Sequence, residues 1–141
     1  MDIYLSAAIR GGRELQQNYQ AISNFLDENG HKVLTHHVAS LNVIEIENSM
    51  SDREIYTQDI TWLHECDVVI AEVSIPSLGV GYEIAYALLL DKPVLGFFEE
   101  NRVISAMISG NTSSNLTLRS YKSISELLIQ IGDFLKSLSK Q

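Results

Sequence analysis

The sequence predicts an α/β fold: a doubly wound, mostly parallel five-stranded sheet with helices on both faces. Short apolar runs alternate along the chain with amphipathic stretches, which is typical of βα units on a parallel sheet. The run DVVIAEV, Asp67–Val73, is almost wholly apolar and rich in β-branched residues, as expected for a strand covered on both faces. We therefore expect this strand to lie at the centre of the sheet.

The first half of the chain contains a strand, a helix, a strand and a long connection. We expect strands at Ile3–Ala7 and at residues 32–35. Between them, apolar residues recur at helical spacing up to a stop signal at Asn29-Gly30. These apolar residues are Leu15, Tyr19, Ile22, Phe25 and Leu26. Residues 38–50 show no clear period and predict an excursion over the surface, before a helix at Asp52–Glu65.

The second half continues the alternation after the central strand. The loop PSLGVGYE, residues 76–83, leads into a helix that ends near Leu90. KPVLGFF, residues 92–98, predicts a fourth strand, and LTLRSY, residues 116–121, predicts a fifth. The amphipathic stretch Ser123–Leu138 predicts a closing helix.

Composition limits the classes of function. A chain of 141 residues with 45% hydrophobic residues and no linker predicts one domain spanning 1–141. The net charge of −8 argues against affinity for nucleic-acid polymers or anionic membranes. Cys66 is the only cysteine, no basic leader precedes the first strand, and no apolar run approaches the roughly 20 residues of a membrane span. We therefore expect a cytoplasmic protein.

Metal and cofactor motifs are weak. His36 and His37 are adjacent at an expected strand end, so their side chains should point to opposite faces. His31, His64 and Cys66 lie in separate predicted elements. The chain has no Walker-type GKS or GKT, and its GVG lacks the third glycine of a dinucleotide fingerprint. We predict no metal and no cofactor.

Two loops lie where doubly wound sheets bind ligands, beyond the carboxyl ends of the first and central strands. They are SAAIRGG, Ser6–Gly12, and the loop at residues 76–83. Glycines, helix N-termini and the guanidinium of Arg10 favour a bound phosphate there, although ordinary turns and a solvated arginine would look the same.

Two carboxylates lean toward the apolar side of their helices. At about 100° per residue, Asp59 falls within the apolar arc of its helix, and Glu83 flanks the apolar stripe that includes Val80. A solvated or dipole-complementing acid is the alternative interpretation. We expect the helix N-terminus to keep Glu83 ionised and an apolar setting to raise the pKa of Asp59. Glycosidic bond cleavage uses such a pair, and with a phosphate site the implied substrate is a nucleotide.

Several motifs together resemble a known family. IYLSAAIRGGRE, THHVA, YTQDITWLHECDVVIAEVSIPSLGVGYE and RVISAMISG are similar to the 2′-deoxynucleoside 5′-monophosphate N-glycosidases, a branch of the nucleoside 2-deoxyribosyltransferase family. The similarity extends from the first strand to about Gly110, and the motifs keep their order and approximate spacing. The resemblance implies a flavodoxin/Rossmann-like fold. It also implies an enzyme that hydrolyses a (deoxy)nucleoside 5′-monophosphate to free base and (deoxy)ribose 5-phosphate.

The resemblance also implies catalytic roles and an assembly. Glu83 matches a nucleophile that forms a glycosyl-enzyme, and Asp59 matches the acid/base residue beside the leaving base. Tyr4 matches a tyrosine that arranges the nucleophile and the sugar. Ser105 and Met107 match residues that reach the site of a neighbouring subunit, which implies a homodimer.

Substrate-binding positions follow from the same resemblance. The residues that match the sugar and phosphate contacts are Ala7, Ala8, Ile9, Arg10, Gly11, Ser77 and Gly79. Transferases of the family carry an acid at the position of Ser77, so the serine removes a charge that would repel a phosphate. Ala7-Ala8 replaces a Gly-Ser pair of similar members, and thereby removes a hydroxyl group.

Three other functions stay open from the sequence. They are base exchange as a nucleoside 2-deoxyribosyltransferase, a cytokinin-type phosphoribohydrolase, and a nucleotide-sensing module without catalysis. Two carboxylates near a phosphate would benefit a pure binder little, which favours an enzyme. The choice between ribose and deoxyribose is also open.

Overall fold

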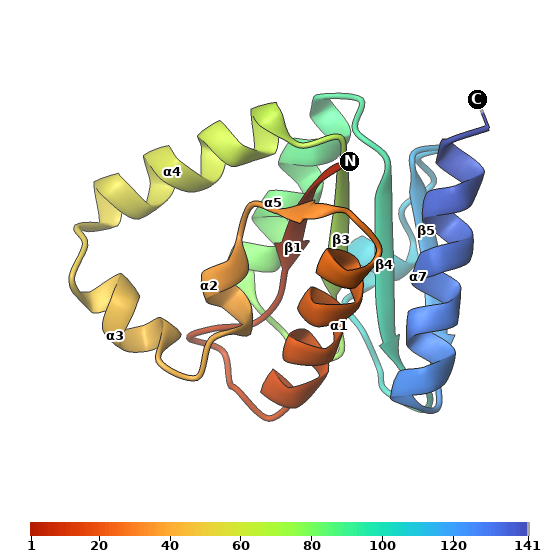
Figure 1. Cartoon of the computed structure of the whole chain (residues 1–141), viewed down its shortest axis with the longest axis horizontal. Helices are drawn as coiled ribbons and strands as arrows, with labels where there is room; N and C mark the ends of the chain where they lie inside the picture. The colour runs from red at the N-terminus through yellow and green to blue at the C-terminus, as the bar shows by residue number, and fades with distance from the viewer. Residues whose placement is uncertain (141) are drawn as a thin grey trace.

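The computed structural model describes residues 1–140, so Gln141, the last residue of the predicted domain, lies outside them. Five parallel strands form one sheet in the order β2-β1-β3-β4-β5 (Figure 1). Their bounds are β1 Asp2–Ser6, β2 Lys32–Val33, β3 Val68–Glu72, β4 Val94–Glu99 and β5 Leu116–Tyr121. The central position of β3 is confirmed, and every neighbouring pair is parallel.

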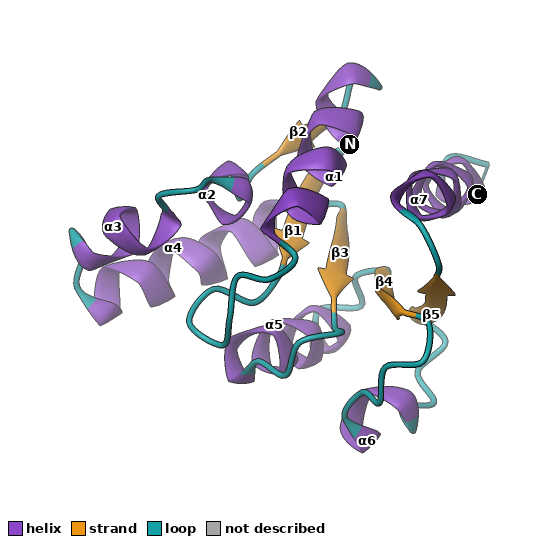
Figure 2. Ribbon diagram, turned by 90° about the horizontal axis from the view of Figure 1, so that it is seen from below, coloured by secondary structure: helices purple, strands orange, loops and turns teal. Residues whose placement is uncertain are grey.

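Helices cover both faces of this sheet. Their bounds are α1 Gln16–Glu28, α2 His36–Ala39, α3 Val43–Asn48, α4 Asp52–Glu65, α5 Leu78–Leu89, α6 Ala106–Ser109 and α7 Ile124–Leu138. Helices α1 and α7 pack on one face, whereas α4 and α5 pack on the other (Figure 2). The predicted doubly wound α/β class is confirmed.

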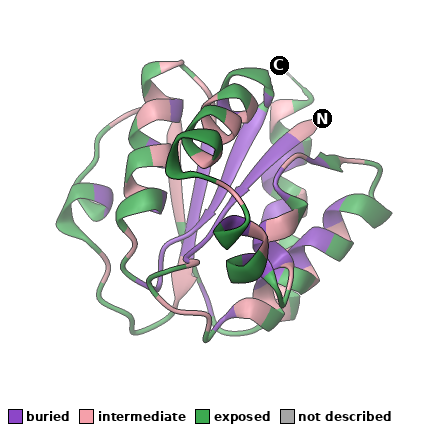
Figure 3. Cartoon of the chain, turned by 90° about the vertical axis from the view of Figure 1, so that its left-hand side faces the viewer, coloured by how far each residue is buried: buried purple, intermediate pink, exposed green. Residues whose placement is uncertain are grey.

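The core is divided by β3, whose residues are all buried and alternate between the two faces (Figure 3). Val68 and Ile70 join the cluster under α1 and α7, and Val69 and Ala71 join the cluster under α4 and α5. This burial explains the continuous apolar run in the sequence.

Local hydrogen bonds define both ends of α4, the helix that carries Asp59. Ser51 and Glu54 form a reciprocal capping box at the start of α4. At the other end of α4, Nζ of Lys92 donates to the carbonyl oxygens of His64 and Cys66, at 2.9 and 2.6 Å. The capping box thus fixes where α4 begins, and Lys92 ties its C-terminal end to the start of β4.

The connection over residues 38–50 differs from the predicted surface excursion. It contains the second half of α2 and all of α3, and it buries Val43 and Glu47. Helices of four and six residues are too short to show a period in the sequence. His36 and His37 lie in α2 rather than on a strand, so the alternation predicted for them is wrong. They still contact different groups, because His36 approaches Asp27 and His37 packs against the ring of Trp62.

Other predicted features can be located in the same part of the chain. Cys66 is buried, and this burial raises the pKa of its thiol to about 11. Across residues 1–140, no group of three or more histidine, cysteine, aspartate or glutamate side chains could hold a metal ion. None of the helices in those residues has the length and apolar character needed to cross a membrane.

Candidate active site

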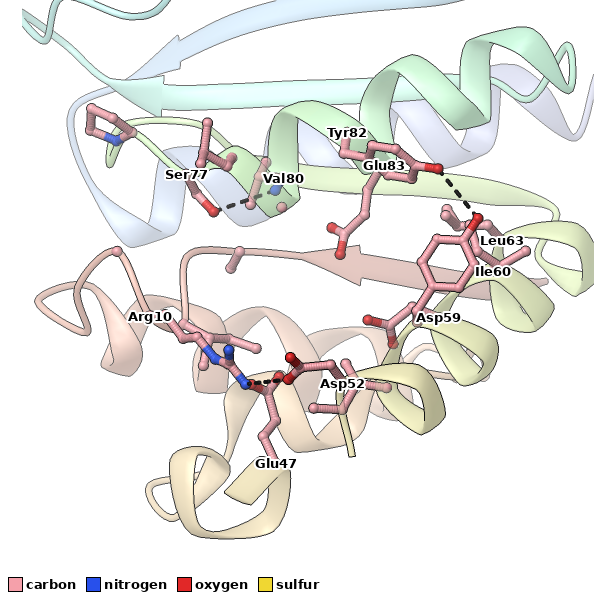
Figure 4. Close-up of a pocket in the computed structure, with 18 residues that line it drawn as sticks. Arg10, Glu47, Asp52, Asp59, Ile60, Leu63, Ser77, Val80, Tyr82 and Glu83 are labelled. Carbon is pink, nitrogen blue, oxygen red and sulfur yellow. Dashed lines mark hydrogen bonds and ion pairs between the residues drawn. The ribbon is translucent and has the colours of Figure 1, made fainter. Parts of the chain in front are cut away.

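The strand order reverses between β1 and β3, and a cavity of about 630 Å³ opens beyond their carboxyl ends (Figure 4). Its walls come from the β1–α1 loop, the β3–α5 loop and helices α3, α4 and α5. The lining residues are Ala7, Ile9, Arg10, Gly11, Glu47, Asp52, Ile55, Tyr56, Asp59, Ile60, Leu63, Pro76, Ser77, Leu78, Gly79, Val80, Tyr82 and Glu83. The two loops singled out in the sequence therefore meet at one cavity.

Gly11 allows the two loops to approach each other. A Cβ atom at this position would lie only 2.8 Å from the carbonyl oxygen of Pro76, which is closer than real Cβ contacts come. The obstacle is backbone and cannot rotate away. Glycine is therefore required at residue 11 for the observed loop arrangement.

Ser77 is the N-cap of α5. Its Oγ accepts a hydrogen bond from the backbone N–H of Val80 at 3.3 Å. The hydroxyl hydrogen remains available to a ligand, and Gly79 lies beside it in the first turn of α5. The N-terminus of this helix therefore presents donors to the cavity.

Glu83 points from α5 into the cavity (Figure 4). Burial raises the pKa of its carboxyl group to about 7, against hydrogen bonds from Ser6 and Tyr4 that lower it, while the charge of Asp59 adds to the rise. The expectation of a fully ionised Glu83 is therefore wrong for the free protein. The physical reason is that burial outweighs the helix dipole, because α5 begins at Leu78 and Glu83 lies beyond the first turn, where the dipole has little effect.

Asp59 faces Glu83 across the cavity from α4 (Figure 4). Burial, followed by the negative charge of Glu47, raises the pKa of its carboxyl group to about 6. The predicted direction is correct. In the free protein both carboxyl groups therefore titrate near neutral pH.

Tyr4 and Ser6 lie on β1 beneath Glu83. Both are buried, and both donate hydrogen bonds to the Glu83 carboxylate. Burial, together with the charges of Glu83 and Asp59, raises the pKa of Tyr4, so its phenol stays protonated as a donor. The role of Ser6 was missed in the sequence, where it was read only as the start of a loop.

Arg10 is on the opposite wall from Ser77 (Figure 4). Its Nε lies 3.5 Å from Oε2 of Glu47, and its Nη2 lies 3.9 Å from Oδ1 of Asp52. Glu47 and Asp52 were not predicted. Helix α3 is too short for its sequence to show that Glu47 lies on the buried face. Asp52 carries only the signal of a helix start.

The remaining predicted residues lie in different places. Ala7, Ile9 and Gly11 line the cavity, whereas Ala8 is fully buried behind it. Ser105 and Met107 line a second cavity of about 390 Å³, which Ser77, Leu78 and Val80 also border. Within this chain these two residues do not reach Glu83.

Tyr56 and Tyr82 complete the first cavity on the side of Asp59, and neither was singled out in the sequence. Their hydroxyl oxygens lie 3.4 Å apart, and each side chain is about half exposed. Tyr82 also stacks on Tyr86. Aromatic residues on partly exposed helix faces carry no sequence signal of a site, because surface tyrosines are common.

A doubly wound sheet with a carboxylate-lined cavity at its switch point defines a class of α/β proteins that bind small ligands there. Within that class, residues 3–126 match the family described as nucleoside 2-deoxyribosyltransferase. The chain belongs to this family, as its motifs predicted.

Curated relatives and solved structures agree with this assignment. A protein of Thermofilum pendens, provisionally named 2′-deoxynucleoside 5′-phosphate N-hydrolase 1, is 43% identical over 137 residues, covering 96% of this chain and 95% of its own. The 5-hydroxymethyl-dUMP N-hydrolase of Rattus norvegicus is 48% identical over 112 residues, covering 77% of this chain and 68% of the rat protein. The structure of the CMP N-glycosidase BcmB of Clostridium botulinum has a TM-score of 0.75 at 23% identity. It covers 95% of this chain and 99% of its own, and it shows the same fold.

Proposed function

We propose that this protein is an N-glycosidase that hydrolyses a (deoxy)nucleoside 5′-monophosphate to free base and (deoxy)ribose 5-phosphate. One observation carries the proposal: Glu83 and Asp59 face each other in a cavity whose end is formed by Arg10 and the N-terminus of α5. The relatives named as nucleotide N-hydrolases, 43% and 48% identical to this chain, support the same reaction.

In the proposed mechanism a carboxylate oxygen of Glu83 attacks C1′ of the sugar and forms a glycosyl ester. The bond from C1′ to the base breaks, and Asp59 gives a proton to the departing base nitrogen. Asp59 then takes a proton from water, whose oxygen attacks C1′ and releases Glu83. Hydrogen bonds from Tyr4 and Ser6 stabilise the Glu83 carboxylate before and after the ester.

The state of the carboxyl pair suits this sequence near neutral pH. Between the pKa values of about 6 and about 7, the two groups together hold about one proton. The reactive form has that proton on Asp59 and the charge on Glu83. The donors Tyr4 and Ser6 lower the free-energy cost of that form.

The phosphate end of the proposed substrate lies between Ser77 and Arg10. The serine hydroxyl and the backbone N–H groups of the first turn of α5 would donate to phosphate oxygens, and the guanidinium would supply a charge. No carboxylate stands at Ser77 to repel the phosphate. This arrangement favours a nucleotide over a nucleoside.

A homodimer is part of the proposal. Ser105 and Met107 line the second cavity, where two apolar side chains are largely exposed, Leu78 at 97% and Met107 at 82%. Val103, next in the chain to the lining residue Ile104, is 93% exposed. A second copy of the chain would cover these side chains and bring its own Met107 toward the first cavity.

The test is release of free base from a panel of deoxy- and ribonucleoside 5′-monophosphates, followed by chromatography. We expect Glu83→Ala to lower the rate on the order of a thousandfold or more while nucleotide binding remains measurable. The proposal fails if the wild-type protein releases no base from any member of the panel.

The same assay separates the alternatives. Adding a second free base yields an exchanged nucleotide only if the protein is a transferase. A phosphoribohydrolase of the cytokinin type releases an N6-substituted adenine from its ribonucleotide. A sensing module binds nucleotides tightly and leaves them intact.

A further inference from the structure

Glu47 is a buried carboxylate in the cavity, and the proposed reaction gives it no role. Helix α3 turns Ile44 outward, 48% exposed, and Glu47 inward, 8% exposed, which is the reverse of an ordinary amphipathic helix. Val43, one turn before Glu47, is fully buried and anchors the inner face. Burying a charge while exposing an isoleucine costs stability, so Glu47 needs a compensating partner.

That partner is Arg10. The 3.5 Å contact between Nε of Arg10 and Oε2 of Glu47 is the ion pair that the structure shows for this carboxylate within residues 1–140. The more exposed Asp52 lies 3.9 Å from Nη2. The two acids thus hold one edge of the guanidinium, while the Arg10 side chain stays 65% exposed and accessible to a ligand.

The charges of the cavity make the position of Arg10 important. Of the described residues that line it, four are acidic, Glu47, Asp52, Asp59 and Glu83, and Arg10 is the single lysine or arginine. A phosphate that enters this cavity therefore meets a positively charged side chain only at Arg10, opposite the N–H groups of α5. Arg10 lies on one wall and Ser77 on the other (Figure 4).

We propose that Glu47 is a positioning residue whose carboxylate holds the Arg10 guanidinium opposite Ser77, so that a 5′-phosphate is bound from both walls. The inference rests on the proposed function, because it concerns the phosphate end of the same cavity. An arginine held before binding loses less side-chain entropy when the ligand arrives than a free one does. The Arg10–Glu47 pair therefore sets the preference for nucleotide over nucleoside.

Glu47 also acts on Asp59, and this supplies a second readout. Its negative charge contributes to the raised pKa of Asp59. The other charged or titratable groups around this pair are Arg10 and Asp52 at the cavity wall, Arg13 after β1, Glu83 from α5 and Tyr4 from β1. Removing the charge of Glu47 lowers the pKa of Asp59, so the acid form of Asp59 is lost at a lower pH.

The test compares Glu47→Gln with Asp52→Asn, which removes the exposed acid beside the same arginine. Binding is measured by calorimetry in a Glu83→Ala background with the four common deoxynucleoside 5′-monophosphates and the four matching deoxynucleosides. We expect Glu47→Gln to weaken nucleotide binding about tenfold and leave nucleoside binding unchanged, since a charge-assisted contact is lost. Asp52→Asn should change the affinity for nucleotides and for nucleosides by less than about twofold, because an exposed ion pair contributes little.

Two further measurements exclude a merely structural role. In an Arg10→Gln background, Glu47→Gln should produce no additional loss of nucleotide binding. In the catalytically intact protein, Glu47→Gln should shift the alkaline limb of kcat/KM to lower pH. If Glu47→Gln does not fold, Glu47→Asp keeps the charge with a shorter reach and should lower the same nucleotide-to-nucleoside binding ratio.

The proposal is overturned if nucleotide and nucleoside binding weaken equally, or if the loss persists without Arg10. Failure of the proposed function looks different. In that case no nucleotide releases its base, yet the ratio of nucleotide to nucleoside binding still reports on Glu47.

Discussion

Buried carboxyl groups are the residues whose environment departs most from water in this protein. Glu83 and Asp59 lie in the cavity, but Glu72 lies outside it, at the end of β3 and fully buried. Its carboxylate accepts hydrogen bonds from the backbone N–H of Ser74 at 3.1 Å, from the Ser74 hydroxyl and from the hydroxyl of Tyr121 at 3.3 Å. Burial nevertheless raises its pKa to about 7.

Glu72 should make the protein less stable as the pH rises. Its unfolded pKa is near 4.5 and its folded pKa is about 7, so its contribution is complete below pH 4.5 and is lost as the pH rises to about 7. The change is about 3 kcal/mol for this group alone. Urea unfolding at pH 5 and pH 8 should therefore show a smaller loss of stability for Glu72→Gln than for the wild type. Equal losses in the two proteins would contradict this account.

At the level of single residues, helical periodicity was enough to direct Asp59 and Glu83 toward one cavity. It failed for Glu47, because α3 is too short to reveal which face is buried. It also failed for the ionisation of Glu83, since that property depends on where α5 begins and on how deeply the side chain is buried. Such burial arises only when α4, β1 and α5 come together.

Among the elements, α5 combines structure with the proposed binding of phosphate. Its N-cap Ser77 has a close structural counterpart in Ser123, the N-cap of α7. Their φ angles are −146° and −147°, and both side chains accept from the N–H group three residues later, at 3.3 and 3.2 Å. Only Ser77 borders the first cavity.

This pair separates stability from binding. We expect Ser77→Ala and Ser123→Ala each to lower the free energy of unfolding by about 1 kcal/mol, because each loses a cap. Only Ser77→Ala should also raise KM for the nucleotide substrate. The measurements are denaturant unfolding and steady-state kinetics on both variants. A similar rise in KM for Ser123→Ala would show that the effect comes from stability alone.

For the whole molecule, the class of fold and the central place of β3 could be read from the sequence because a strand buried on both faces has a distinctive composition. The length of β2 could not, since the strand ends at Val33 and Thr35 bonds to β1 through its side chain instead of its backbone. Its hydroxyl accepts from the N–H of Leu5 and donates to the carbonyl of Leu5, at 2.9 and 2.7 Å. The place of Ser105 and Met107 beside the second cavity could not be read either, because it depends on how the β4–β5 connection folds back against α5.

The proposed dimer predicts that Met107→Glu weakens assembly and lowers activity at low protein concentration. A charge at this largely exposed methionine would be buried between two copies. Ile129→Glu is the matched control, because Ile129 is 65% exposed on α7, on the opposite face of the sheet. Analytical ultracentrifugation should show dissociation for Met107→Glu and none for Ile129→Glu. A wild-type protein that sediments as a monomer at all concentrations would contradict the dimer.

Ser77, Leu78 and Val80 border both cavities, so one short stretch of backbone is a wall between them. Substitutions selected to admit a new substrate on one side of this wall also reshape the surface on its other side. Directed evolution of the substrate range should therefore accumulate compensating changes around Ile104 and Ile108, which touch only the second cavity. A library that varies only the first cavity would miss the variants that need a compensating change in the second.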